Sequence, residues 1–160
     1  MATAHLLFGP VGSGKTSFAR ELEERHRAVR FTPDEWMARL FGADPPADRF
    51  AVNAEAIAAL LEPIWCRCLR LGLDVVLDYG FWRRAERDHA RALVRAAGGE
   101  ARLYALRCPA DEARRRVAAR NHRPERTLFI APEAYDLLAA RVEPLAADEP
   151  HLVIDTAPRL

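Results

Sequence analysis

The sequence predicts an α/β fold in which helices cover both faces of a mostly parallel sheet. Three observations lead to this class. Short apolar runs alternate with longer helical stretches along the chain, which is the pattern of repeated strand–helix units. A glycine-rich loop joins the first apolar run to the first helical stretch. At 160 residues, with no internal repeat or low-complexity linker, the chain has the length of one domain spanning residues 1–160.

Five short apolar runs are predicted to be the strands of the sheet. They are residues 5–8 (HLLF), 28–31 (AVRF), 73–78 (LDVVLD), 101–107 (ARLYALR) and 151–155 (HLVID). The run at 73–78 gives the clearest strand signal. Because helical stretches separate the runs, the strands are expected to pair in parallel.

The stretches between these runs are predicted to be helices. They cover residues 13–26, 32–42, 49–71, 83–97, 110–120 and 132–142. In the second, Thr32 can be the N-cap, Pro33 suits the first helical position, and Gly42 ends the helix. Pro63 predicts a kink or a break in the third helix.

The charge balance argues against a dedicated nucleic-acid-binding protein. Lys and Arg total 24, Asp and Glu total 23, and the net charge is +1, whereas such proteins usually carry a strong basic excess. Half of the residues are hydrophobic and 29% are charged, as is typical of soluble globular proteins. Lys15 is the only lysine.

The cysteines and histidines predict neither a disulfide framework nor a metal site. Cys66, Cys68 and Cys108 are odd in number and lack paired zinc spacing, so we expect a reduced, cytoplasmic protein. The five histidines show no ligand spacing. We expect no signal peptide and no membrane partner, because no charged N-terminal region precedes an apolar run and no run is long enough to cross a bilayer.

Residues 9–16 (GPVGSGKT) match the phosphate-binding pattern G-x-x-x-x-G-K-[ST] without mismatch. Glycines let successive backbone N–H groups curl around an anion, and the helix N-terminus adds partial positive charge. We expect Lys15 to reach the β- and γ-phosphates of ATP and Thr16 to place its hydroxyl on Mg²⁺. The alternative is a glycine-rich turn without a ligand. The nucleotide-binding residues expected from the motif are Gly9, Gly12, Ser13, Gly14, Lys15, Thr16 and Ser17.

Two carboxylates follow predicted strands. Asp78 ends a segment that resembles a Walker B strand, and we expect it to bind Mg²⁺ or to line the acceptor site; the alternative is an ordinary turn. Asp34 follows the second strand, and ligands gather at the carboxyl ends of parallel strands. It is therefore our candidate general base for an attacking hydroxyl. The alternative is that Asp34 only complements the helix dipole.

Arginines gather late in the chain, in RRRVAARNHRPER. Arg116 and Arg120 are four residues apart and share a helix face, and Arg123 follows in a polar loop. Phosphoryl transfer needs cations over the developing charge, so these arginines can contact phosphate within a lid over about residues 116–132. The alternative is a solvated basic helix face.

The acceptor side is less defined by the sequence. Arg83, Arg84 and Arg87 open a helix, where positive charge is unfavourable to the dipole. They can meet an anionic acceptor, for which Arg83 is the leading candidate, or simply face solvent. Trp36 and Trp82 can wall an acceptor pocket or pack in the core.

The loop, together with TPDEWMARL, VVLDYGFWRRAERD and RVAARNHRPERTLFIAPEAYDLLAARVEP, resembles small bacterial P-loop kinases of the AAA family ATPases. That group is similar to the polynucleotide 5′-kinase domain, zeta-toxin kinases and chloramphenicol phosphotransferase, and the resemblance covers nearly the whole chain. It implies an adenylate-kinase-like sheet of five strands in the order 2-3-1-4-5 with a small lid. It also implies that Asp34 is the general base, that Arg120 begins the lid, and that Arg123 contacts phosphate. By the same resemblance, Asp155 and Thr156 lie near the adenine.

One position departs from the polynucleotide 5′-kinase pattern. That pattern has an acceptor-binding arginine three residues after the base, where this chain has Met37. The leading hypothesis is therefore an ATP- and Mg²⁺-dependent phosphotransferase acting on a hydroxyl of a small molecule. The alternatives are a polynucleotide 5′-hydroxyl kinase and a nucleotide-binding regulatory module without turnover. The sequence does not indicate the oligomeric state.

Overall fold

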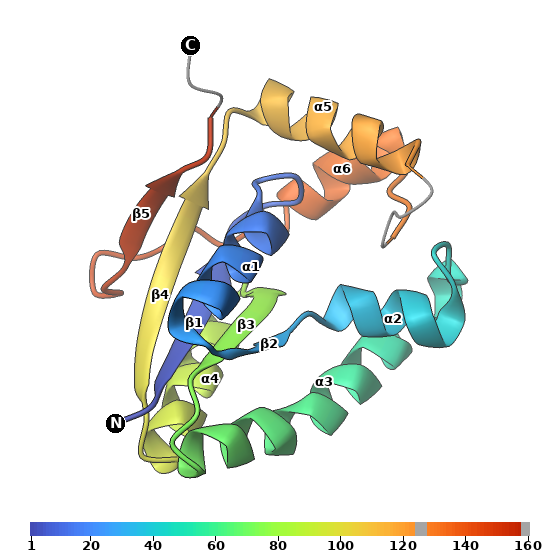
Figure 1. Cartoon of the computed structure of the whole chain (residues 1–160). Coiled ribbons are helices and arrows are strands. Elements are labelled where there is room, and N and C mark those ends of the chain that lie inside the picture. The colour runs from blue at the N-terminus through green and yellow to red at the C-terminus, as the bar shows by residue number, and fades with distance from the viewer. Residues whose placement is uncertain (124–127, 158–160) are drawn as a thin grey trace.

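The five predicted strands form one parallel sheet. The structure is a computed structural model that describes residues 1–123 and 128–157. Its strands are β1 (Thr3–Phe8), β2 (Val29–Phe31), β3 (Val75–Gly80), β4 (Glu100–Arg107) and β5 (Leu152–Asp155). They pair in the order β2-β3-β1-β4-β5, and every pair is parallel (Figure 1). Both the fold class and the strand order implied by the resemblance are thus confirmed.

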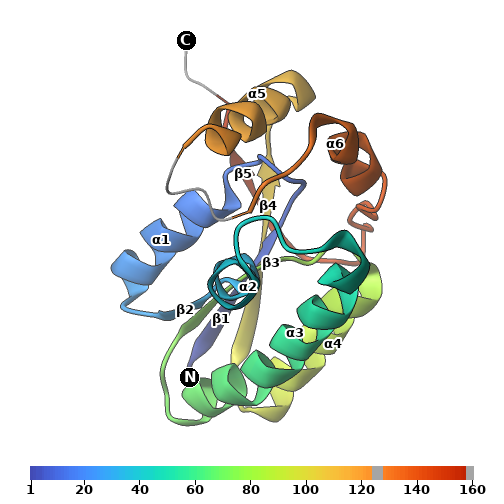
Figure 2. The ribbon, with the colours of Figure 1, turned by 90° about the vertical axis from the view of Figure 1, so that its right-hand side faces the viewer.

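Helices cover both faces of this sheet. They are α1 (Lys15–His26), α2 (Pro33–Phe41), α3 (Ala47–Arg70), α4 (Arg84–Ala96), α5 (Ala110–Asn121) and α6 (Pro132–Ala139). Figure 2 shows α1 on one side of the sheet and α3 and α4 on the other. Of the predicted lid, residues 124–127 lie outside the described residues. In the described part, no helix is both long and apolar enough to cross a membrane.

Two helices differ from the sequence prediction. The α3 helix runs through Pro63 as one element, because the buried side chains of Leu61 and Trp65 hold both halves against the same core. The α6 helix ends at Ala139 instead of 142. The N–H groups of Arg141 and Val142 bond to carbonyls three residues earlier, so the last turn tightens.

Alternation along the strands decides which side chains reach the candidate site. Leu6 and Leu77 point into the core beneath α3 and α4, whereas Leu7 and Val76 point into the core beneath α1. Because side chains alternate with a period of two, Asp78 shares the face of Val76. The strand therefore carries the Asp78 carboxylate to the side of the sheet on which α1 begins.

A buried ion pair fixes the start of α4 to the segment before β5. The side chains of Arg87 and Glu149 are 0% and 1% exposed, and Nε and Oε2 lie 2.7 Å apart. A second bond of 2.8 Å joins Nη2 to Oε1, which gives the bidentate geometry that arginine favours. Arg87 also donates to the carbonyls of Phe81 and Trp82. The hydrogen bonds that Glu149 accepts, first of all from Arg87 and then from the Ala146 N–H and Arg91, lower the pKa of Glu149 to about 2.

This pairing corrects the expectation for Arg87, which neither meets an acceptor nor faces solvent. Its neighbours at the start of α4 are more exposed. Arg84 donates two hydrogen bonds to Asp148, at 2.9 and 2.6 Å. Arg83 is exposed at the position before the helix, and its backbone N–H bonds to Glu86.

Replacing Glu149 with Gln should destabilise the fold by about 3–5 kcal/mol, because the charge of Arg87 is left buried without the opposite charge that pairs with it. Urea unfolding measures this change. Asp148→Asn is the matched control, since its pair with Arg84 is exposed and should contribute at most about 1 kcal/mol.

The same pair predicts a pH dependence. Because the pKa of Glu149 falls from 4.5 to about 2 on folding, its stabilisation is present above pH 4.5 and is lost as the pH falls toward 2. Glu149→Gln should remove this part of the acid destabilisation. An unchanged acid profile in the variant would contradict the assignment.

Candidate nucleotide site

The loop between β1 and α1 has the conformation that a phosphate cradle needs. Gly12 and Gly14 have φ values of 77° and 90°, in the left-handed region that favours glycine. A Cβ on Gly12 would lie 2.4 Å from the carbonyl oxygen of Ala113 in α5, so a side chain does not fit there. Gly14 is the N-cap of α1, and no side chain caps the helix start. Its first N–H groups, which include that of the exposed Ser17, are thus available to an anion.

Lys15 and Thr16 extend from this loop toward the end of β3. The Lys15 Nζ donates to the carbonyls of Gly9 and Pro10 at 2.9 and 2.7 Å. The Thr16 hydroxyl donates to Asp78 Oδ2 at 2.8 Å. A hydroxyl and a carboxylate meeting in this way are oxygen ligands of the kind that Mg²⁺ prefers. The arrangement fits a metal held next to bound phosphates.

Sequence reasoning missed the part of Thr32 in this cluster. It was expected to cap α2, and it does occupy the N-cap position, but its side chain makes no capping hydrogen bond. Its hydroxyl instead donates to Asp78 Oδ2 at 3.2 Å and accepts from Arg30 at 2.5 Å. Arg30 also pairs with Glu35 at 3.0 Å. The available signal was position, because Thr32 directly follows a predicted strand.

Asp34 lies near the charges of Lys15, Asp78 and Arg120 at the start of α2. Asp34 is an exposed residue, and its carboxylate accepts no hydrogen bond from the described residues. Loss of surrounding water, followed by the negative charge of Asp78, raises the pKa of Asp34, while Lys15 and Arg120 oppose the rise. A free carboxylate with a raised pKa is suited to accept a proton.

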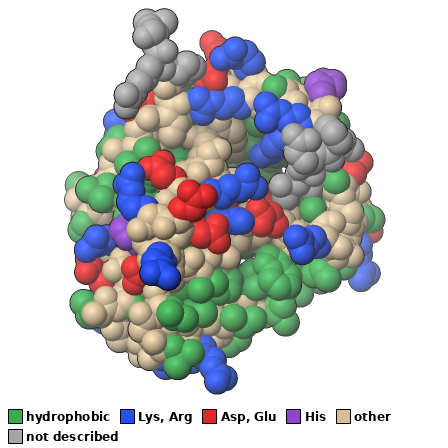
Figure 3. Space-filling view, viewed as in Figure 1, with side chains coloured by type: hydrophobic (Ala, Val, Ile, Leu, Met, Phe, Trp, Pro, Cys, Tyr) green, Lys and Arg blue, Asp and Glu red, His purple; other side chains and the backbone are tan. Residues whose placement is uncertain are grey.

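Burial also shifts the other two charged groups. It raises the pKa of Asp78 against the effect of Lys15 and the two threonine hydroxyls. It lowers the pKa of Lys15 against the effect of Asp78 and Asp34. In Figure 3, acidic and basic side chains lie together over the region where α1, β2 and α2 meet, whereas hydrophobic side chains cover much of α3.

The three candidate lid arginines have different surroundings. Arg120 is the one near Lys15 and Asp34, and its Nε is buried with no hydrogen-bond partner in the described part of the chain. Arg123 is exposed, and its backbone N–H bonds to the Arg120 carbonyl. Arg116 bonds to the segment after β5 and to its own helix.

Arg116 and Thr156 attach the end of β5 to the glycine loop. Arg116 donates to the Thr156 carbonyl at 2.5 Å and to Glu112 at 2.7 Å. The Thr156 hydroxyl lies 2.7 Å from the carbonyl oxygen of Ser13 and donates to it. The Ser13 hydroxyl itself is buried without a partner among the described residues.

A cavity of about 630 Å³ adjoins the loop at the ends of β1, β4 and β5. Its lining is mainly apolar, with Asp155 at the β5 end. A cavity with apolar walls and a few polar groups beside a phosphate loop is suited to a nucleotide base. The lining residues are Phe8, Pro10, Leu106, Arg107, Cys108, Pro109, Val153, Asp155 and Ala157.

The two tryptophans named as acceptor candidates are placed differently. The Trp82 Nε1 donates to the Gly9 carbonyl at 2.9 Å, so this side chain supports the loop. A Cβ on Gly80 would lie 2.9 Å from the same nitrogen, which explains a glycine at that position. Trp36 is 40% exposed on α2.

Comparison with known proteins decides the family. A family model described as an AAA domain (AAA_33) matches residues 5–156. The chain belongs to this AAA_33 family. A search of the curated proteins found no match to this chain.

Solved structures resemble the AAA_33 chain over most of its length. A putative kinase from Chloroflexus aurantiacus is 17% identical, with a TM-score of 0.78, and the match covers 98% of this chain and 89% of that one. A gluconokinase from Sinorhizobium meliloti 1021 is 15% identical, with a TM-score of 0.68 and coverage of 98% and 84%. A chain of the Pnkp1/Rnl/Hen1 RNA repair complex is 19% identical, with a TM-score of 0.73 and coverage of 88% and 44%. The AAA_33 chain therefore has the P-loop kinase fold.

Trp82→Phe should weaken nucleotide binding by about 2–10-fold, because phenylalanine keeps a smaller aromatic ring but lacks the N–H that donates to the loop. Titration with a fluorescent ATP analogue measures the dissociation constant. Trp36→Phe makes a comparable change on α2 and should leave nucleotide affinity unchanged. Equal effects of the two changes would contradict a supporting role for Trp82.

Proposed function

We propose that this protein is an ATP- and Mg²⁺-dependent phosphotransferase that acts on a hydroxyl of a small molecule. The observation that carries the proposal is the Asp34 carboxylate, which feels the charges of Lys15 and Arg120 and accepts no hydrogen bond from the described residues. A loop that only binds nucleotide needs no unpaired carboxylate at this point. The family and the kinase names of several structural neighbours support the same reaction class.

Each group in the cluster has a distinct role in this proposal. ATP supplies the phosphoryl group, and Mg²⁺ neutralises phosphate charge. The loop and Lys15 hold the phosphates, while Thr16 and Asp78 hold the metal. Asp34 takes the proton from the acceptor hydroxyl while the hydroxyl oxygen bonds to the γ-phosphorus and ADP leaves. Arg120 faces the charge that develops on the transferred group, and Arg123, three residues further along the chain, is a second candidate for this role.

The surroundings of Asp34 favour a small acceptor over a nucleic-acid end. Met37 occupies the position of the acceptor-binding arginine in the polynucleotide 5′-kinase pattern, and its side chain is 2% exposed. It belongs to the core, so this position offers no cation to an acceptor phosphate. Arg83 is exposed near Trp82 and can contact an anionic acceptor.

The unpaired cysteines Cys66, Cys68 and Cys108 fit a reducing cytoplasm.

An acceptor screen tests the reaction class. The protein is incubated with ATP, Mg²⁺ and a library of hydroxyl-bearing metabolites and antibiotics, and phosphorylated products are detected by mass. A parallel arm uses oligonucleotides with a free 5′-hydroxyl. Transfer only in the second arm would favour the polynucleotide kinase, for which the likeness to a chain of the RNA repair complex is the supporting observation. ATP binding without product in either arm would favour a regulatory module.

Asp34→Asn should lower kcat by about 10²–10⁴-fold, because the attacking hydroxyl loses its general base. The affinity for ATP should stay nearly unchanged. Glu35→Gln is the matched control: it removes an adjacent carboxylate that is paired with Arg30, and it should keep most of the activity. Product formation at the unchanged rate in Asp34→Asn would overturn the assignment of the base.

The pH profile gives a second test of Asp34. Since its pKa is raised above 3.8, kcat should fall with decreasing pH at a higher pH than for an ordinary aspartate. Arg120→Met removes a charge that lowers this pKa, so the acid limb should move to higher pH. Glu35→Gln removes a charge that raises it, so the limb should move to lower pH. Shifts in the opposite directions would contradict the assignment.

A further inference from the structure

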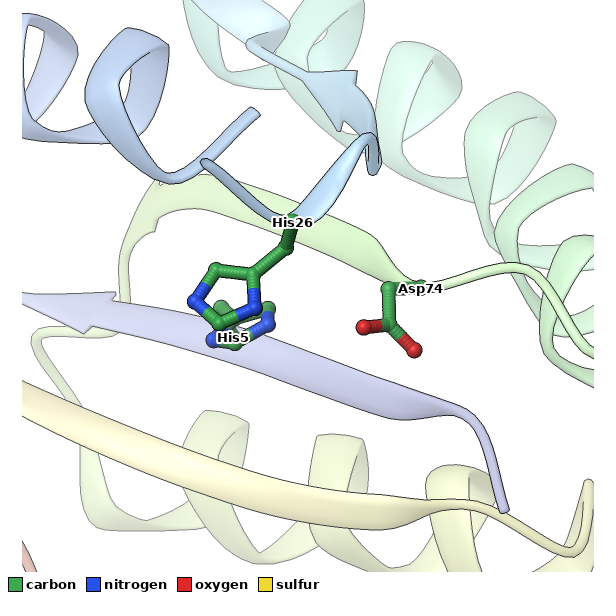
Figure 4. Close-up of side chains that lie close together, drawn as sticks. All are labelled: His5, His26 and Asp74. Atoms are coloured by element: carbon green, nitrogen blue, oxygen red, sulfur yellow. The ribbon is translucent and has the colours of Figure 1, made fainter. Parts of the chain in front are cut away.

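Two histidines and an aspartate meet at the opposite end of β1 from the glycine loop. His5 lies in β1, His26 is the last residue of α1, and Asp74 precedes β3. One ligand atom from each can be chosen so that all three lie within 4.8 Å of one another. Figure 4 shows the two imidazole rings one over the other with the Asp74 carboxylate beside them. Among the described residues, this is the one such group of His, Cys, Asp and Glu side chains.

The contacts of His5 leave one ring nitrogen for a ligand. His5 is fully buried, and its Nδ1 lies 2.9 Å from the Tyr104 hydroxyl. Its Nε2 is buried with no hydrogen-bond partner in the described part of the chain. A buried polar atom without a partner is costly. Metal-binding histidines commonly have the other ring nitrogen fixed in this way by a neighbouring group.

The remaining two side chains are held in a comparable manner. Asp74 Oδ1 accepts a hydrogen bond of 2.7 Å from the Thr3 backbone N–H, which leaves its second oxygen available. His26 packs against His5 with ring centroids 4.5 Å apart and an interplanar angle of 36°. The surrounding charges largely neutralise each other, since Arg102 pairs with Glu100 at 3.1 Å.

We infer that His5, His26 and Asp74 form a binding site for a transition-metal ion such as Zn²⁺. Two imidazoles and one carboxylate are a common ligand set for this ion, with water in the fourth position. Coordination by a histidine uses a neutral imidazole nitrogen, and the Nε2 of His5 is buried without a partner among the described residues.

To hold the ion, the three ligand atoms must come closer together and the His26 ring must turn, because the in-plane nitrogen lone pairs of two stacked rings do not meet at one point. Ligand bonds of about 2.0–2.2 Å place the atoms of a tetrahedral site roughly 3.4 Å apart. His26 can supply most of the movement, because it is the final residue of a helix and is only partly buried. The ion would join the end of α1 to the sheet. It would lie roughly 18 Å, the length of this 12-residue helix, from the proposed Mg²⁺ site.

Metal titration of the full chain tests the site. The protein is treated with chelator, freed of it, and titrated with Zn²⁺ in the absence of nucleotide; calorimetry gives the stoichiometry, and Co²⁺ absorption reports the ligands. One equivalent should bind. At a free Zn²⁺ concentration about 100 times Kd, Tm should rise by roughly 5–10 °C.

Two variants and a control test the ligands without changing the buried His5. His26→Gln and Asp74→Asn should each weaken Zn²⁺ binding at least about tenfold; the asparagine oxygen can still accept from Thr3. His89→Gln is the control, because His89 is an exposed histidine paired with Glu62 in another part of the molecule, and it should bind like the unchanged protein. Absence of saturable binding, or loss in only one of the two ligand variants, would overturn the three-ligand site. Either result leaves the phosphotransferase proposal unaffected.

Discussion

The buried carboxylate of Asp78 joins the elements on which the candidate site depends. It accepts from Thr16 at the start of α1 and from Thr32 at the end of β2. Its position follows from strand alternation, which places it on the α1 face of β3, between β2 and β1 in the sheet. Since the carboxyl ends of parallel strands meet at one edge of the sheet, Asp34 is brought into the same cluster. Asp78 thus links the glycine loop, through Thr16, to the segment before α2, through Thr32.

The glycine loop is held from behind by groups that do not face a ligand. Trp82 bonds to Gly9, and Thr156 bonds to Ser13. Arg87 in turn holds the carbonyls next to Trp82 through its buried pair with Glu149. These contacts come from the segments that follow β3 and β5, so distant parts of the domain hold the loop that contains Gly12 and Gly14. A preorganised loop loses less conformational entropy when it binds.

The sequence predicted the parts of the site that depend on local order along the chain. The loop pattern, Asp78 near the end of β3 and Asp34 after β2 could be placed because each lies within or next to its own strand or helix. The roles of Arg87, Thr32 and Trp82 were not found, because their partners are distant in the sequence or were assigned to a competing role such as helix capping. The proximity of His5, His26 and Asp74 was not predicted for the same reason: three segments of the chain bring them together, and their spacing in the sequence carries no ligand pattern.

The only lysine of the chain lies in the loop, and burial lowers its pKa. Reagents that acylate side-chain amines therefore have a single target in this protein, Lys15, apart from the chain terminus. Bound phosphates would cover that target. Because the chain has a single lysine, the extent of amine labelling would report how much of the loop is filled.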